Sequence, residues 1–226
     1  MINKSRFQGL KINSSMTKQA IVLVMFLLVA SFVRGQNTNR FILKTSVVEL
    51  LTGDFVTTSW SPNLIIEIPL KNNYSFQQGI GLILPDNTLD KDMVFIFVDR
   101  LFGVSIRPEL KKYLSKNKDV LNGFYLSVDA KGVYTNAELS VSKAVVKRIG
   151  IATHLNVGYQ VFTKSNFSLE LSAGIGPGYI YSTSSIEKAE LGLIEYRHGI
   201  LYAGGSGAYF SYQFDIRIGY FIRLKR

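Results

Sequence analysis

The sequence predicts an all-β protein, an eight-stranded antiparallel transmembrane β-barrel of the up-and-down meander type that follows an N-terminal signal peptide. Three observations predict it. An apolar run follows basic residues at the N-terminus, apolar and polar residues alternate through most of the remaining chain, and short connections alternate with long ones between the alternating segments.

Residues 1–35 have the layout of a secretory signal peptide. The basic residues that precede the apolar run are Lys4, Arg6, Lys11 and Lys18. The run from Ala20 to Val33 has fourteen residues, fewer than the roughly 20 that a helix needs to cross a bilayer. We therefore expect cleavage after Gly35, which leaves residues 36–226 as the barrel domain, with Met16 as an alternative start of translation.

The charge and the absence of cysteine argue against nucleic-acid binding, a disulfide framework and a lipid anchor. The chain has 26 Lys and Arg residues against 16 Asp and Glu residues. Residues 1–35 hold five of the basic residues and no acidic one, so the remainder has 21 against 16, a net charge of +5. These charges alternate along strands and form no basic face, so we expect no nucleic-acid partner. Without cysteine, neither a disulfide framework nor an N-terminal lipid anchor is available.

The first three strands are the weakest of the series. A first strand is expected near Arg40–Leu51, where either face of Phe41–Lys44 suits the outside, so its facing stays open. Leu64–Leu70 alternates apolar residues with Glu67 and predicts the second strand. Tyr74–Leu84 predicts the third, although Gln78 interrupts its apolar face.

Five further segments alternate at period two and predict the other strands. They are Phe102–Lys111, Phe124–Lys131, Ile151–Phe162, Phe167–Tyr179 and Tyr212–Leu224. In the last of these, only Phe221 interrupts the polar face. Apart from Phe124–Lys131, which has eight residues, the runs span about 10–14 residues. That is enough to cross a bilayer at a tilt, whereas strands of soluble sandwiches have about 5–6.

The polar faces of these strands carry charges of both signs, as the interior of a membrane barrel does and the dry core of a soluble protein does not. Eight strands leave room for side chains and little else, so opposite charges should pair inside. The predicted lumen charge network comprises Glu67, Arg107, Glu109, Lys111, Asp129, Lys131, His154, Glu170, Asp215, Arg217 and Arg223. We favour a plug of salt bridges over a narrow ion path.

Connection lengths give an independent indication of a membrane barrel. Polar turns are expected at Lys71–Asn73 and Lys164–Asn166, and a moderate connection at Ser115–Asn122. The longer stretches between them are Thr52–Asn63, Pro85–Asp99, Thr135–Arg148 and Ser182–Tyr209. If the N-terminus is periplasmic, the tight turns are periplasmic too, and the four long loops are extracellular.

Few residues suggest chemistry. Lipid A deacylases of the outer membrane use His, Ser and Glu, and here Glu170 on the neighbouring strand is the acidic candidate for His154, while Asn156 occupies the nearest same-face position. We favour a hydrogen-bonded interior histidine.

The second histidine, His198, falls in the longest loop. The segment Gly174–Gly178 lacks the helix and lysine of a phosphate loop. Without cysteine and with two distant histidines, we expect neither a metal site nor a cofactor.

Two segments carry a family resemblance. Ser61–Leu70, with its Pro-Asn and Glu-Ile-Pro-Leu sequences, and Ile106–Tyr113 are similar to the second and fourth strands of a family of exported barrels that is described as a domain of unknown function. More broadly, the chain resembles the small OmpA/OmpX-like outer-membrane barrels. The resemblance implies a membrane-embedded barrel and supplies no catalytic residues. Such barrels usually end on an aromatic residue, whereas this chain ends Leu224-Lys225-Arg226.

We therefore expect a porin-like but non-enzymatic protein of a Gram-negative cell envelope, integral to the outer membrane. Expected partners are outer-membrane lipid and lipopolysaccharide, the outer-membrane assembly machinery, and a surface or membrane-complex protein bound through loop 182–209. A lipid-active enzyme, a narrow channel for small solutes and a soluble periplasmic carrier are the alternatives.

Overall fold

The structure is a computed structural model that describes residues 40–52, 59–85, 98–115, 121–139, 143–185 and 205–223. Contacts divide the chain into two units, Met1–Asn37 and Thr38–Arg226, and the described residues all belong to the second. The expected signal peptide, the last three residues and most of loop 182–209 therefore lie outside the described residues.

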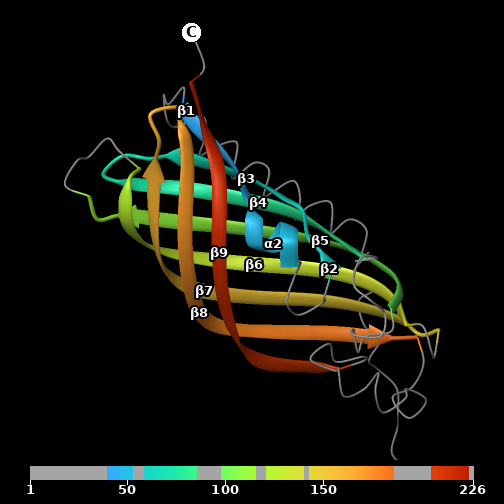
Figure 1. The fold of residues 1–226 in the computed structure, drawn as a ribbon. Coiled ribbons are helices and arrows are strands. Elements are labelled where there is room, and N and C mark those ends of the chain that lie inside the picture. The colour runs from blue at the N-terminus through green and yellow to red at the C-terminus, as the bar shows by residue number, and fades with distance from the viewer. Residues whose placement is uncertain are drawn as a thin grey trace, which may run out of the picture. The chain divides into compact units, whose positions relative to one another are not determined.

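The described part of the chain is built almost entirely of strands, with one short helix (Figure 1). In chain order the elements are β1 (Arg40–Ser46), α2 (Val47–Thr52), β2 (Ser59–Trp60), β3 (Asn63–Pro69), β4 (Tyr74–Pro85), β5 (Val98–Tyr113), β6 (Gly123–Leu139), β7 (Val145–Phe162), β8 (Phe167–Ser184) and β9 (Ser206–Arg223). No helix among the described residues has the length and apolar character needed to span a membrane.

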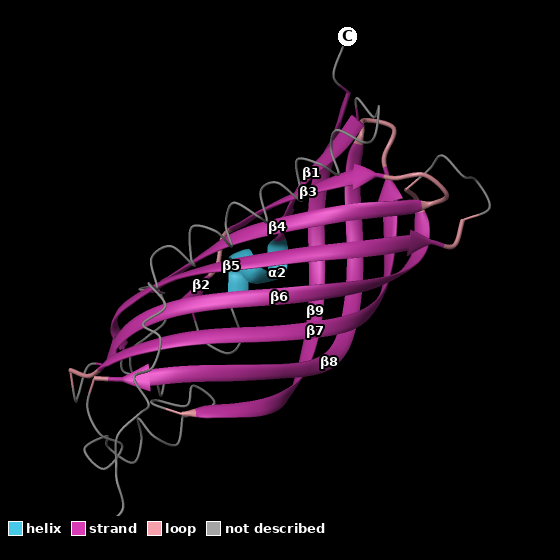
Figure 2. Cartoon of the chain, turned by 180° about the vertical axis from the view of Figure 1, so that it is seen from behind, coloured by secondary structure: helices cyan, strands magenta, loops and turns pink. Residues whose placement is uncertain are grey.

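Eight of the strands form a closed sheet in which each strand pairs with its neighbours in sequence. The order is β4-β3-β1-β9-β8-β7-β6-β5, every pairing is antiparallel, and β5 returns to β4. The two-residue strand β2 adds to β4 outside this cycle. Figure 2 shows β4 to β8 running side by side. The predicted all-β class and the eight-stranded antiparallel meander are confirmed, with two residues of β2 in addition.

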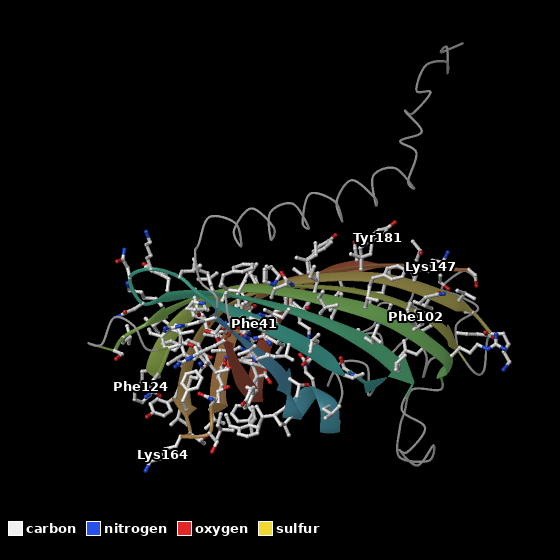
Figure 3. All side chains as sticks on the ribbon, turned by 90° about the horizontal axis from the view of Figure 1, so that it is seen from above. Phe41, Phe102, Phe124, Lys147, Lys164 and Tyr181 are labelled. Carbon is white, nitrogen blue, oxygen red and sulfur yellow. The ribbon has the colours of Figure 1, made fainter. Side chains whose placement is uncertain are left out.

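Side chains alternate strictly between the two faces of the closed sheet. Along β7 and β8 the inner-face residues are buried, except Gly174 and the last residue of each strand, which are half-buried, and the residues between them are exposed. In Figure 3, Phe124 and Tyr181 project away from the sheet. The open question of the first strand is also answered, because Ile42 and Lys44 are buried inside.

The first strand is shorter than predicted, because a helix replaces its second half. Ser46 accepts a hydrogen bond from the backbone N–H of Glu49 at 3.0 Å, so it caps the first turn of α2. Ser46 and Glu49 have the spacing of a capping box, and the acidic side chain also suits the positive end of the helix. The prediction of a strand up to Leu51 is therefore wrong.

Strands β5 to β9 have 16 to 18 residues and exceed the predicted lengths. The expected loop Thr135–Arg148 is wrong, since Thr135 and Arg148 are themselves partners in the β6–β7 ladder. The expected bounds of loop 182–209 are also too wide, since β8 continues to Ser184 and β9 begins at Ser206. This part of β6 places the polar residues Asn136 and Glu138 where the preceding alternation has apolar ones, so the hydropathy pattern ends before the strand does. The two tight turns are as predicted, with positive φ at Asn72 and Asn166.

Candidate functional site

The end of the closed sheet that carries the tight turns is filled by apolar side chains. The buried cluster there consists of Ile42, Tyr113, Leu121 and Tyr125, against which Phe162 and Phe221 pack. The rings of Tyr113 and Tyr125 lie 5.3 Å apart, centroid to centroid. Phe221, which interrupts the polar face of the last strand in the sequence, is thus part of an apolar layer that covers the interior.

A layer of fully buried charges lies next to the apolar layer. Its cations are Lys44, Lys111 and Arg217, and its anions are Glu67, Glu109 and Glu170. Glu170 accepts hydrogen bonds from Lys111 Nζ and Arg217 Nη1, both at 2.7 Å, and from the hydroxyl of Tyr125 at 2.5 Å. Three positive charges therefore meet three negative ones, which is the condition under which buried ions are tolerated.

Arg217 connects this layer to a second group of charges. Its Nε donates to Asp215 Oδ2 at 2.6 Å, and Arg107 Nη1 lies 3.2 Å from the same oxygen. Arg107 Nη2 in turn lies 2.8 Å from Asp129 Oδ2. The ion pairs thus extend through the interior from the apolar layer to Asp129.

Asp129, His154 and Ser211 lie in line at the end of this network. His154 Nδ1 is 2.7 Å from Asp129 Oδ1, and His154 Nε2 is 2.8 Å from Ser211 Oγ. The three residues come from β6, β7 and β9, with Asp129 and His154 directly opposite each other in the ladder. Asp129 Oδ2 accepts further hydrogen bonds from Gln213 at 2.8 Å and from Asn156 at 3.1 Å. The acid–imidazole–hydroxyl order is that of a serine hydrolase triad.

The backbone behind His154 is irregular. The β7–β8 ladder passes from Ala152↔Gly178 to Leu155↔Ile175 in one register, but Thr153 and His154 form no ladder pairs with Pro177 and Gly176 opposite them. Proline has no N–H to donate to a ladder. A Cβ on Gly176 would lie 1.8 Å from the carbonyl oxygen of Thr153, so this close approach requires glycine.

A cavity of about 160 Å³ adjoins His154 and Ser211. Its wall includes the apolar residues Val133, Ala152 and Ile180. Charged lining residues are Glu49, Arg107, Lys131, Arg148 and Asp215. Tyr212 and Phe214 also line the cavity, although their side chains are 74% and 60% exposed on the outer face. The cavity therefore borders β9 at residues whose side chains project to the outer face.

Beside this cavity, β9 lacks a second partner among the described strands, because β1 pairs with only one end of β9. Residues 217–223 of β9 pair with β1, whereas residues 206–216 pair with β8 alone among the strands that the structure describes. Helix α2 contacts β9 and β2, and it lies between them in Figure 1. A helix thus stands where a continuation of β1 would have completed the wall.

Ten of the eleven predicted network residues point into the interior, and one does not. Lys131 lies at the cavity, 3.3 Å from Glu49, apart from the central pairs. Arg223 is exposed at the end of β9, with its guanidinium 5.6 Å from the ring of Phe221, so its assignment to the network is wrong. Phe221 ends the inner face two residues earlier and covers the interior.

The predicted partnership of His154 with Glu170 is also wrong. Glu170 pairs in register with Gln160, six residues along β7 from His154, and binds Lys44, Lys111 and Arg217. Asp129 lies opposite His154 instead. The second histidine, His198, lies outside the described residues.

The predicted network lacks Lys44, Tyr113, Tyr125 and Ser211, although the alternation does place Tyr125 on the polar face of its strand. Lys44 was missed because the facing of the first strand was open, and the tyrosines because aromatic residues do not count as polar. Ser211 precedes the predicted start of the last strand by one residue. Continuing the inner-face positions Asp215 and Gln213 backward by two residues would have found it. No cluster of His, Cys, Asp or Glu in the described ranges is arranged to hold a metal ion.

Comparison with known proteins places most of the chain in one family. Residues 21–195 match the family model described as "Protein of unknown function (DUF3575)". No curated protein and no solved structure matches the chain.

Proposed function

Since the chain belongs to the DUF3575 family, whose function is unknown, we propose from its structure that it is an integral β-barrel protein of a Gram-negative outer membrane. Residues 1–35 direct its export, the outer-membrane assembly machinery inserts it, and lipid and lipopolysaccharide surround it. It resembles the small OmpA/OmpX-like barrels in having an interior filled by its own side chains. Its role is that of a closed scaffold that presents extracellular loops, above all 182–209, to a surface or membrane-complex protein.

The inverted placement of apolar and charged residues carries the proposal. The most buried large side chains include Arg217, Lys111, Glu67 and Glu170, whereas the outer face exposes Leu155 to 67%. The same exposed apolar character continues on all the long strands. A protein surrounded by water buries such side chains, and a bilayer covers them.

Aromatic residues border the exposed apolar band at both ends. At the tight-turn end, the Phe124 and Tyr159 rings lie 4.8 Å apart and the Phe167 and Tyr220 rings 5.2 Å apart. Aromatic residues exposed toward the other end are Phe102, Tyr134, Tyr179, Tyr181 and Phe210. Such rings suit the two interfaces of a membrane.

The height of the band agrees with a bilayer. Phe124 and Tyr134 lie ten residues apart on β6, which corresponds to about 33 Å along a strand. At the usual tilt of roughly 40°, this gives a height of about 25 Å, the typical apolar height of an outer-membrane barrel. Short turns are periplasmic in such barrels, so the Asp129–His154–Ser211 end faces the cell exterior.

One substitution tests the membrane assignment. Arginine at the outer-face position Leu155, near mid-band, should destabilise the folded barrel by about 2–4 kcal/mol. We expect the wild type in the outer-membrane fraction with heat-modifiable mobility on gels, and Leu155→Arg to accumulate unfolded. Lys164→Glu, in a tight turn outside the band, is the matched control and should assemble normally. Recovery of the wild type in the soluble periplasmic fraction would overturn the assignment.

The scaffold role is tested at the long loop. Residues 187–203 are replaced by a short Gly/Ser linker, and native membranes are cross-linked before purification. We expect the variant to keep its heat-modifiable mobility and to lose the proteins that co-purify with the wild type. An unchanged set of co-purifying proteins would contradict a role for this loop.

A further inference from the structure

We propose that Asp129, His154 and Ser211 form a serine esterase site for lipids with a hydrophobic acyl chain. The inference goes beyond the scaffold role, and its choice of substrate rests on the proposed membrane location. The expectation of a non-enzymatic protein pairs His154 with Glu170, whereas in the structure His154 binds Asp129 and Glu170 binds Arg217.

The hydrogen bonds give each member of the site a defined role. A carboxylate that accepts the Nδ1–H of His154 fixes the ring orientation and leaves Nε2 as the base toward Ser211. Asp129 is itself held by Arg107, Asn156 and Gln213 through its other oxygen. Donors on the acid and packing around it are the support that a precise catalytic geometry requires.

Ser211 differs from the other interior serines in its partner. Ser46 and Ser75 donate to carboxylates, as does Ser127 to Glu109 at 2.6 Å. Ser211 alone among the described serines contacts an imidazole nitrogen. A carboxylate contact orders a hydroxyl, whereas a neutral imidazole can also remove its proton.

The three residues differ in solvent exposure, as a serine nucleophile with a shielded base requires. His154 and Asp129 are buried, whereas Ser211 is partly exposed and borders the cavity. The base and its orienting acid are thus shielded, and the hydroxyl faces the space in which a carbonyl group has to lie.

The cavity wall indicates a hydrophobic acyl group. Val133, Ala152 and Ile180 provide apolar surface in the cavity, and the cavity also borders Tyr212 and Phe214, whose side chains are exposed on the outer face. In a membrane, lipid contacts the outer face of β9, and the acyl chain enters beside residues 206–216, which have one strand partner among the described strands. The charged lining residues Arg107 and Lys131 suit the polar or anionic remainder of a lipid.

The incomplete wall also supplies groups for the transition state. In an antiparallel strand, alternate residues direct their N–H and C=O groups to opposite sides. Residues 206–216 pair with β8 on one side, and none of the described strands pairs with their other side, where α2 contacts β9. Every second N–H around Ser211 is therefore directed toward α2. Backbone N–H groups in this position can stabilise the oxyanion of an ester intermediate.

The reaction balances with water as the only co-substrate. Ser211 Oγ forms a bond to the ester carbonyl carbon as His154 Nε2 takes the hydroxyl proton. The C–O bond then breaks, and the leaving alcohol receives that proton. Water attacks the acyl-serine, passes a proton to His154, and the free carboxylic acid leaves as the proton returns to Ser211.

A serine-directed fluorophosphonate probe tests the site in the full-length barrel, purified in detergent. We expect stoichiometric labelling that peptide mass spectrometry maps to Ser211, and its loss in Ser211→Ala. Ser172→Ala is the matched control, because Ser172 is buried on the inner face of β8, lacks a hydrogen-bond partner and does not line the cavity. Each variant is first checked for heat-modifiable mobility, so that a folding defect is recognised. Labelling of folded wild type that is absent, or unchanged in Ser211→Ala, would overturn the proposal.

Turnover is measured on p-nitrophenyl octanoate and acetate, with the octanoate preferred. We expect kcat to fall roughly 10³-fold or more in Ser211→Ala and Asp129→Asn, and to be unchanged in Ser172→Ala. Equal rates in the wild type and Ser211→Ala would overturn the assignment.

Vesicles of phospholipid and vesicles that contain lipopolysaccharide distinguish the source of the acyl chain, with released fatty acid detected by mass spectrometry. Release from either one identifies the substrate. Hydrolysis of the synthetic ester alone would overturn the lipid assignment. A membrane-integrated barrel without esterase activity would leave the proposed scaffold function standing.

Discussion

Arg217 illustrates how single residues hold the interior together. It is fully buried and donates to Asp215, Glu109 and Glu170, so one guanidinium joins three carboxylates from three strands. The planar, forked geometry of arginine makes such multiple contacts favourable, whereas a lysine offers a single point of charge. The sequence predicted Arg217, Glu109 and Asp215 as interior residues from their period alone.

Neutralising Glu170 should destabilise the fold, because its carboxylate contacts Lys44, Lys111 and Arg217. Glu170→Gln leaves these cations short of one negative charge in a site without water contact. We expect a loss of about 3–5 kcal/mol in the free energy of unfolding, the range for breaking a buried ion pair. Urea titration of the folded barrel in detergent measures the loss.

The matched control for Glu170→Gln is Glu138→Gln. Glu138 lies 3.9 Å from Arg100, whose side chain is 85% exposed. Exposed pairs contribute about 0–1 kcal/mol, so the control should unfold close to the wild type. Equal losses in both variants would show that the interior charges do not stabilise the fold in the way that their contacts indicate.

At the scale of the element, the sequence located strands better than their ends. Alternation is visible in the sequence only where the outward residues of a strand are apolar. On β6 the outward residues are apolar as far as Tyr134, whereas Asn136 and Glu138 are polar. The hydropathy pattern therefore measured the apolar band, while backbone pairing continues to Leu139. The helix after Ser46 was missed because six residues are too few to show a 3.6-residue period, although its capping spacing was readable.

The close approach of Gly176 on β8 to the Thr153 carbonyl group on β7 gives a prediction for this strand pair. Gly176→Ala would place a methyl group 1.8 Å from the Thr153 carbonyl oxygen, so β7 has to move at His154. We expect a loss of about 1–3 kcal/mol, the usual cost of overpacking, together with loss of fluorophosphonate labelling at Ser211. Urea titration and probe labelling measure the two effects.

Gly79→Ala, on β4, is the control for this glycine substitution. A Cβ at Gly79 would have its nearest neighbour at 3.5 Å, an ordinary van der Waals contact. We expect stability and labelling near the wild-type values. A Gly176→Ala protein as stable and as reactive as this control would refute the close approach.

At the scale of the whole molecule, two adjacent layers close the interior toward the tight turns. The tyrosines and phenylalanines form the first, and the fully paired buried charges form the second. The order of these layers could not be predicted from the sequence. The two-residue alternation shows which face of the sheet a residue occupies, but it does not show which residues of other strands lie at the same level along the barrel axis. Lys44 and Glu170, for example, lie 126 positions apart in the chain.

Closure by two layers predicts that the protein does not conduct ions. Eight strands leave an interior that side chains fill, whereas 16-stranded porins hold an aqueous channel. In planar bilayers we expect no steady current above that of the bare membrane, with a 16-stranded porin inserted in the same way as the positive control. The double variant Tyr113→Ala, Tyr125→Ala should also stay closed, because the charge layer beneath these rings remains. Stable unitary currents from the wild type would mean that the layers part in the membrane, and would favour the channel over the closed scaffold.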